Sequence, residues 1–470
     1  MLFLLFSTTL VPPLVVSLLY REGEAAHFLF TSAIACATGL ALWLPWRRRA
    51  RAIRTRDGFA IVAFLWTAMS LLGGIPFMLA LDLSFADAVF ESASGYTTTG
   101  ATVLVGLDAM PKSILLYRQE LQWLGGIGVI VLAVAMLPFL GVGGMQLYKA
   151  EVPGPFKDDR TTPRIARAAR TLSVLYVALT GLCAVCFWLA GMDAFDALAH
   201  AMSTLSTGGY STHDASIGYF DSPLIEAIAI VFMLIGGINF GVHFLAWRML
   251  RLHFYGHDTQ TRVFFWIVLA LIAYVAGTLF TTGTYEEPAQ ALRHGAFQVV
   301  SVITTTGFGT ATFAAWPLAL PVILIFSSFV GGSAGSTSGG LKVIRMVILA
   351  KQAGVQLQRL VHPRVVRPVK VDGRVVSGGI IDGIWGFFAI YVGVFSLLLV
   401  LLMADGLDQV TAFGAVATCL NNLGPGLGEV ASNFIAVSAE SKLLMAVAML
   451  LGRLEIFTFL VLLTPAFWRR

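Results

Sequence analysis

Four short segments of this 470-residue chain have the residue types of a site for a small dehydrated cation. They read TTTGAT at 97–102, STGGYS at 206–211, TTTGFG at 304–309 and NNLGPG at 421–426, and none contains a charged side chain. Glycine permits φ values that are closed to other residues, so successive backbone carbonyls can turn toward one axis and replace the hydration shell of an ion. Because divalent ions usually draw on carboxylates, the pattern favours a monovalent cation.

The four segments align on Gly100, Gly208, Gly307 and Gly424. A single Thr–Gly pair often only ends a helix or allows close packing, whereas four pairs in one repeated context favour a shared function. We therefore predict an ion filter, with K⁺ as its metal ion, at the following residues: Thr98, Thr99, Gly100, Ser206, Thr207, Gly208, Thr305, Thr306, Gly307, Asn422, Leu423 and Gly424.

Each segment follows a short, partly apolar stretch that lies between two longer apolar runs. The helical part of that stretch, about 10–13 residues, is too short to cross a hydrocarbon core of about 30 Å. It predicts a re-entrant pore helix with an extended return, which membranes tolerate only where protein or a water-filled cavity surrounds the backbone. The expected division is an N-terminal hairpin with its basic link at 1–57, pore units at 58–148, 171–250, 251–350 and 378–470, and cytoplasmic linkers at 149–170 and 351–377.

The composition agrees with a membrane protein. Hydrophobic residues make up 57% of the chain and charged residues 12%, against about 25% charged in soluble domains. The fold class predicted is an all-α polytopic membrane protein with four pseudo-repeated units around one pore, preceded by a two-helix hairpin. Lys and Arg cluster in alternate connections, so both termini are expected to be cytoplasmic. The four cysteines lie in apolar segments, and no covalent cofactor is expected.

A second glycine-rich segment, SSFVGGSAGSTSGGLK, interrupts the last apolar run of the third unit. Such a sequence does not sustain a helix in mid-membrane, so it predicts a flexible loop on the cytoplasmic side of the filter that could block the pore. A packing hinge is the alternative interpretation. The predicted gate, within 331–341, comprises Gly331, Gly332, Ser333, Gly335, Ser336, Thr337, Gly339 and Gly340, with Arg453 as their partner.

Some charged residues lie inside apolar runs. Arg453 is the deepest, and an intramembrane charge marks function by default, with the carbonyls and hydroxyls of the loop as the favoured partner. Partly from a resemblance to a known family, we predict that it anchors the closed loop. Arg118 and Glu120 lie near the outer end of a run, and we expect them to make interfacial contacts rather than to serve transport.

These residues resemble the Trk/Ktr/HKT superfamily of potassium transporters, and the N-terminal hairpin favours its bacterial Trk branch. The resemblance rests on the four loops, on the link KAEVPGPFKDDRTTPRIARAAR, and on GGSAGSTSGGLK and LGRLEIFT as gate elements. It implies potassium uptake across the bacterial inner membrane by a homodimer, with a cytosolic TrkA-type regulatory subunit that binds nucleotides. The fourth loop departs from Thr–Gly, which implies weaker selectivity than in a symmetric channel.

Other interpretations remain open at this stage. A Na⁺-permeable or Na⁺-coupled member of the superfamily would share the four loops, as would the pore subunit of a potassium pump. Passive flux and proton-coupled symport are not distinguished. An enzyme is not expected, because the middle stretches offer hydroxyls and glycines rather than converging acids, bases or metal ligands. No nucleic-acid partner is predicted.

Overall fold

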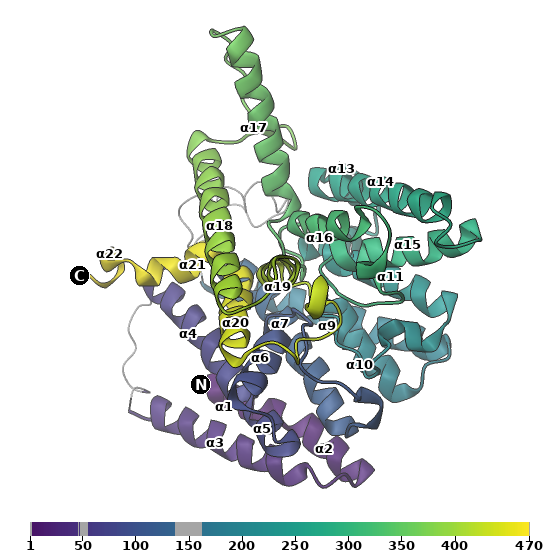
Figure 1. Ribbon diagram of the computed structural model, residues 1–470. Helices are drawn as coiled ribbons and strands as arrows, with labels where there is room; N and C mark the ends of the chain where they lie inside the picture. The colour runs from purple at the N-terminus through teal and green to yellow at the C-terminus, as the bar shows by residue number, and fades with distance from the viewer. Residues whose placement is uncertain (1, 46, 48–54, 137–161, 470) are drawn as a thin grey trace.

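The computed structural model describes residues 2–45, 47, 55–136 and 162–469. Within these residues nearly all of the regular secondary structure is helical (Figure 1), which confirms the predicted all-α class. Six of the described helices are long and apolar enough to cross a membrane, and up to eight spans result if each sharply bent helix pair is counted as one. The protein is therefore a multi-pass membrane protein.

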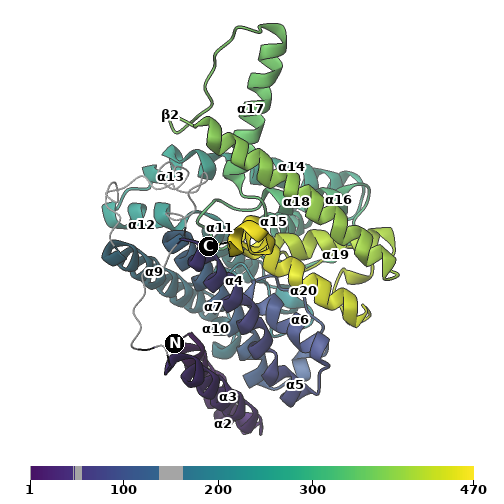
Figure 2. The ribbon, with the colours of Figure 1, turned by 90° about the vertical axis from the view of Figure 1, so that its left-hand side faces the viewer.

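The N-terminal hairpin lies at one edge of the molecule (Figure 2). Its first span consists of α1 (Leu2–Thr9) and α2 (Val11–Tyr20), and its second is α3 (Ala25–Trp43). Glu22, in the turn between the spans, accepts hydrogen bonds from the backbone amides of Lys112 and Ser113. This contact ties the hairpin to the start of the inner helix of unit 1.

Each of the four units contains an outer helix, a short pore helix and an inner helix. Unit 1 comprises α4 (Thr55–Gly73), α5 (Ile75–Leu81), α6 (Phe85–Tyr96) and α7 (Lys112–Met136). Unit 2 comprises α9 (Thr162–Leu189), α10 (Ala194–Leu205), α11 (Pro223–Gly237) and α12 (Phe240–Met249). Unit 3 comprises α14 (Thr259–Thr281), α15 (Pro288–Ile303), α16 (Leu320–Val330) and α17 (Val343–Val361), and unit 4 comprises α18 (Gly378–Ala404), α19 (Gln409–Asn421), α20 (Ala439–Arg453) and α21 (Ile456–Leu460). Shorter elements are α13 (His253–His257), α22 (Pro465–Trp468) and 3₁₀ turns at Leu107–Ala109, Ser216–Phe220, Phe313–Ala315, Gly428–Val430 and Val461–Leu463.

The pore helices α6, α10, α15 and α19 have 12, 12, 16 and 13 residues. The third is longer than expected because Pro288, at its first position, starts the helix early. Ser84, Asp193 and Asp408 cap the other three by accepting hydrogen bonds from first-turn amides. Each pore helix ends directly at one of the predicted filter segments.

Three of the inner helices are broken part-way along. The axes of α11 and α12 differ by 102°, and those of α20 and α21 by 111°. In unit 3 the helix stops at Val330 and resumes at Val343, which confirms the predicted interruption. By contrast, α7 runs unbroken over its 25 described residues. The breaks bring non-helical backbone to the inner side of the filter segments.

The second linker lies within the described residues, whereas the first does so only in part. Most of 149–170 lies outside the described residues, and 162–170 forms the start of α9. In the second linker β1 (Lys370–Val371) pairs antiparallel with β2 (Arg374–Val375) through a turn at Asp372 and Gly373, both at positive φ. Before this hairpin, α17 projects well beyond the helical body (Figure 1).

Candidate ion filter and the loop beneath it

The same backbone distortion occurs once in each unit. Thr98, Thr207, Thr305 and Asn422 have φ of 53°, 51°, 55° and 55°, the left-handed region that non-glycine residues rarely adopt. All four are buried. Because such strain persists only where the surroundings impose it, its fourfold recurrence marks equivalent functional positions.

The strained residues correct the alignment of the second unit. Two residues after each lies a glycine at positive φ: Gly100 (82°), Gly209 (77°), Gly307 (84°) and Gly424 (104°). The equivalent glycine of unit 2 is therefore Gly209, and the alignment on Gly208 was wrong by one residue. The sequence STGGYS offers two adjacent glycines, and only the backbone conformation separates them.

The four glycines pack head to tail into a closed ring. A Cβ added to each glycine would clash with a backbone carbonyl oxygen of the next unit, namely that of the residue immediately before the ring glycine of that unit. The separations are 2.1 Å from Gly100 to Gly208, 1.9 Å from Gly209 to Thr306, 2.1 Å from Gly307 to Leu423, and 2.9 Å from Gly424 to Thr99. The contacts run through units 1, 2, 3, 4 and back to 1. Glycine is thus required at each point of contact, and the four loops surround one axis.

Three carbonyls of this ring have unused acceptor capacity. Among the described residues, no hydrogen-bond donor is found for the carbonyl oxygens of Thr99, Thr306 or Leu423, although all three residues are fully buried. Buried carbonyls are normally paired, so such a ring suits a ligand that accepts electron density from oxygen, namely a cation. The fourth, Gly208, accepts a hydrogen bond of 2.6 Å from Gln122 Nε2.

Hydroxyl and amide side chains brace the loops from behind. The Thr97 and Thr99 hydroxyls lie 2.7 Å apart, and those of Thr304 and Thr306 lie 2.8 Å apart. Asn422, in the divergent fourth loop, donates from Nδ2 to the Thr99 hydroxyl at 3.0 Å. The asparagine therefore links the fourth loop to the first.

The loop between α16 and α17 lies directly against the inner ends of the filter loops. The Gly339 amide donates to the Thr305 hydroxyl at 2.6 Å, and the Thr337 hydroxyl donates to the carbonyl of Leu205 at 2.9 Å. A Cβ on Gly339 would lie 1.9 Å from the carbonyl oxygen of Asn421. The predicted loop thus contacts three of the four units just below the filter.

Arg453, the last residue of α20, contacts this loop as expected. Its Nη1 donates to the carbonyl of Thr337 at 2.7 Å, and the residue is only 6% exposed. Its Nε and Nη2 have no partner in the described part of the chain. A buried charge with one hydrogen bond contributes little to stability, which favours a functional role, and the role as gate anchor stays a prediction.

Acidic side chains gather at the outer ends of units 1 and 2. His213 Nδ1 lies 2.5 Å from Asp108, and its Nε2 lies 3.1 Å from Asp196, while Asp214 accepts from the amides of Gly106 and Leu107. The hydrogen bond from His213 holds the pKa of Asp108 below its ordinary value of 3.8. These contacts join the outer loops of units 1 and 2.

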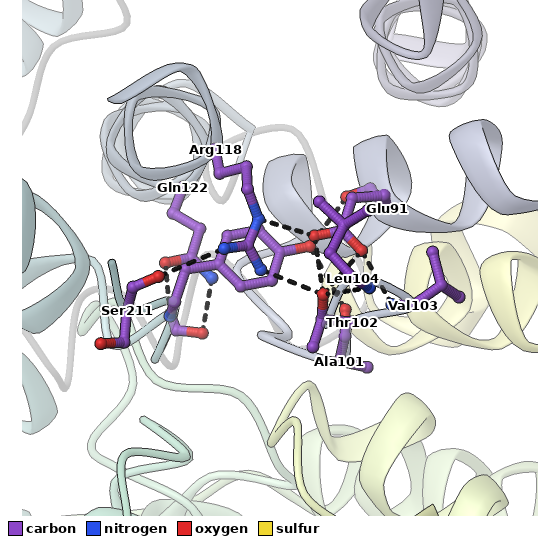
Figure 3. Close-up of polar contacts among 10 residues, drawn as sticks. Glu91, Ala101, Thr102, Val103, Leu104, Arg118, Gln122 and Ser211 are labelled. Carbon is purple, nitrogen blue, oxygen red and sulfur yellow. Dashed lines mark hydrogen bonds and ion pairs between the residues drawn. The ribbon is translucent and has the colours of Figure 1, made fainter. Parts of the chain in front are cut away.

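Arg118 does not make the interfacial contacts expected from the sequence. It is 1% exposed and pairs with Glu91 of pore helix α6, with Nε 2.8 Å from Oε1 (Figure 3). Glu120, also expected at the interface, is 6% exposed. The Glu91–Arg118 pair was not predicted, because the two residues are far apart in the chain and belong to different helices.

The ring of four re-entrant loops within an all-α membrane fold defines a polytopic protein of channel-like architecture. Comparison with known proteins agrees: the family model described as cation transport protein TrkH matches residues 25–470. The Trk system potassium uptake protein TrkH of Vibrio parahaemolyticus is 51% identical over 100% of this chain and 98% of that protein, and TrkG of Escherichia coli is 40% identical over 99% and 96%. The crystal structure of the potassium transporter TrkH from Vibrio parahaemolyticus matches with a TM-score of 0.93, at 49% identity, over 100% of this chain and 97% of that one. The chain belongs to the TrkH family of cation transport proteins.

Proposed function

We propose that this protein takes up potassium ions across the bacterial inner membrane through the ring of filter loops. The observation that carries the proposal is the closed ring of Gly100, Gly209, Gly307 and Gly424 against neighbouring carbonyls. Its uncharged, carbonyl-rich lining suits a weakly hydrated monovalent ion. Relatives that match the whole chain are named potassium uptake proteins, which favours K⁺ over Na⁺ and transport over enzyme activity.

The same proposal includes control from the cytoplasmic side. The loop 331–341 would close the path below the filter, and Arg453 would hold it there through Thr337. We further propose a homodimer regulated by a TrkA-type cytosolic subunit that binds nucleotides, with both chain termini in the cytoplasm. The support is family membership, together with the basic linker that contains Arg359, Arg364 and Arg367.

The test is uptake of ⁸⁶Rb⁺ into proteoliposomes that contain the purified protein, with and without the regulatory subunit. We expect uptake that unlabelled K⁺ competes away more effectively than Na⁺ or Li⁺. Equal competition by Na⁺ would support the sodium-permeable alternative. No uptake under either condition would refute the proposal. An imposed pH gradient that drives or stops uptake would identify proton coupling.

A further inference from the structure

One buried polar network joins the outer parts of the first and second filter loops (Figure 3). Its centre is the Glu91–Arg118 ion pair, whose side chains are 0% and 1% exposed. Arg118 uses its other nitrogens to reach across both loops: Nη2 donates to the Thr102 hydroxyl at 3.0 Å, and Nη1 donates to the carbonyl of Ser211 at 3.2 Å. Thr102 and Ser211 each lie two residues after their ring glycine, Gly100 and Gly209.

Glu91 fixes the return of its own loop. Its carboxylate accepts from the Thr102 hydroxyl at 2.9 Å and from the Val103 amide at 3.0 Å. Tyr210 of the second loop donates its hydroxyl to the Glu91 carbonyl at 2.9 Å, and its ring lies under the Arg118 guanidinium, 4.2 Å from Cζ. All three nitrogens of the Arg118 guanidinium thus donate to a filter loop or to the pore helix behind it.

The network differs between the four units. The residue two helical turns before the strained position is Glu91 in unit 1, His200 in unit 2, Gln298 in unit 3 and Ala415 in unit 4. His200 Nε2 lies 2.9 Å from the Ser211 hydroxyl, and Gln298 donates to the carbonyl of Ala311 at 2.6 Å. The same pore-helix position therefore secures the returning loop in three units. The first uses a carboxylate whose ion pair extends to the next unit, whereas in unit 2 the His200 ring lies 6.0 Å from the ring of Phe308 in the third loop.

We propose that Glu91 and Arg118 are positioning residues that set the spacing of the first and second filter loops, and thereby the preference of the filter for larger over smaller monovalent cations. The inference rests on the proposed ion-uptake function and deepens it. The pair acts through geometry, because its opposite charges are in direct contact and largely cancel at the ion path. The planar guanidinium is suited to this task, since it holds several acceptors at fixed angles.

Two single substitutions separate geometry from charge. Glu91→Gln keeps the size of the side chain but removes the charge and replaces one acceptor oxygen by an NH₂ donor, so the contacts to Arg118, Thr102 and Val103 cannot all persist. Arg118→Lys keeps the charge but removes the fork that reaches Thr102 and Ser211. We expect both to lower the ⁸⁶Rb⁺/²²Na⁺ uptake ratio about five- to tenfold, mainly through greater Na⁺ entry, because the loops relax toward shorter ion–oxygen distances. A wild-type ratio in Arg118→Lys together with a fall in Glu91→Gln would instead assign the effect to charge and overturn the proposal.

A second ion pair provides the matched control. Arg293 contacts Glu226 through Nε at 2.9 Å and Nη2 at 2.8 Å, and Glu226 is 3% exposed, yet the pair joins α15 to α11 without touching a filter loop. We expect Glu226→Gln to lower the thermal unfolding temperature while leaving the uptake ratio unchanged. An equal change of ratio in Glu226→Gln would show that general destabilisation is responsible, and would refute the positioning role.

The double variant Glu91→Gln/Arg118→Met guards against misfolding, because it leaves no buried charge without its partner. We expect it to recover thermal stability relative to Glu91→Gln but to keep the low ratio. Recovery of the wild-type ratio would overturn the inference. Wild-type protein in the same vesicles distinguishes failure of the proposed function from failure of the positioning role. Absence of ⁸⁶Rb⁺ uptake by the wild-type protein refutes the proposed function, whereas normal uptake with unchanged ratios in the variants refutes only the positioning role.

Discussion

Replacement of Arg453 by alanine should increase ion flux. The substitution removes the hydrogen bond from Nη1 to the carbonyl of Thr337, which links α20 to the loop below the filter. A hydrogen bond from a charged donor contributes about 1.5–3 kcal/mol. If the bond exists only when the loop blocks the path, its loss raises the ratio of open to closed protein roughly 10- to 150-fold.

The substitution should not destabilise the fold. Nε and Nη2 of Arg453 have no partner among the described residues, so alanine also removes a buried charge that is poorly satisfied. We therefore expect faster ⁸⁶Rb⁺ uptake into proteoliposomes without the regulatory subunit, together with an unfolding temperature that is unchanged or higher. This combination separates a gate from a structural anchor, whose loss would lower both.

Lys442→Met is the matched control. Lys442 lies on the same helix, is 6% exposed and donates to Asp87 at 2.6 Å, but it is at the outer end and does not touch the loop. We expect this variant to lose thermal stability without faster uptake. Unchanged flux and unchanged regulation in Arg453→Ala would refute the gating argument, as would an equal increase in the control.

Two further substitutions test the ring and its contact with the loop. Gly209→Ala should abolish ⁸⁶Rb⁺ uptake, because its Cβ would lie 1.9 Å from the carbonyl oxygen of Thr306. The control Gly181→Ala, with open space around the added methyl group, should transport normally. Uptake by the Gly209→Ala protein would contradict the proposed ring. Thr305→Val removes the acceptor of the Gly339 amide and leaves that amide unpaired at a cost of about 1–3 kcal/mol. We expect faster basal uptake and a lower unfolding temperature, and slower uptake would show that the contact favours the open path instead.

The architecture was largely predictable from the sequence, because the same pattern of apolar runs and Thr- and Gly-rich segments recurs in each of the four units. Four short helices before Thr- and Gly-rich segments indicate re-entrant loops, since such helices cannot cross the bilayer. The interruption of unit 3 follows from its run of glycine and serine. The contact between Arg453 and that run was expected from the cost of a buried charge together with the family resemblance. These features depend on local composition and on the membrane as solvent.

The details of the site depend on geometry that composition does not specify. Gly208 and Gly209 are chemically identical neighbours, and only the positive φ of Gly209 identifies the ring position. The breaks after Gly237 and Arg453 occur without the dense glycine run that marks unit 3. Arg118 appeared interfacial because hydropathy shows its depth along the chain but not the direction in which its side chain points. Glu91, its partner, becomes apparent only when pore helix and inner helix are placed side by side.

The differences among Glu91, His200, Gln298 and Ala415 have a consequence for how such a protein evolves. In an assembly of four identical chains, one mutation alters every quadrant at once, so a damaging change is multiplied by four. Here the quadrants lie on one polypeptide, and a mutation at this pore-helix position alters a single quadrant while all four ring glycines stay in place. Under the proposed function, variation at this position would therefore adjust ion preference one quadrant at a time, without the loss of transport expected when a ring glycine is replaced.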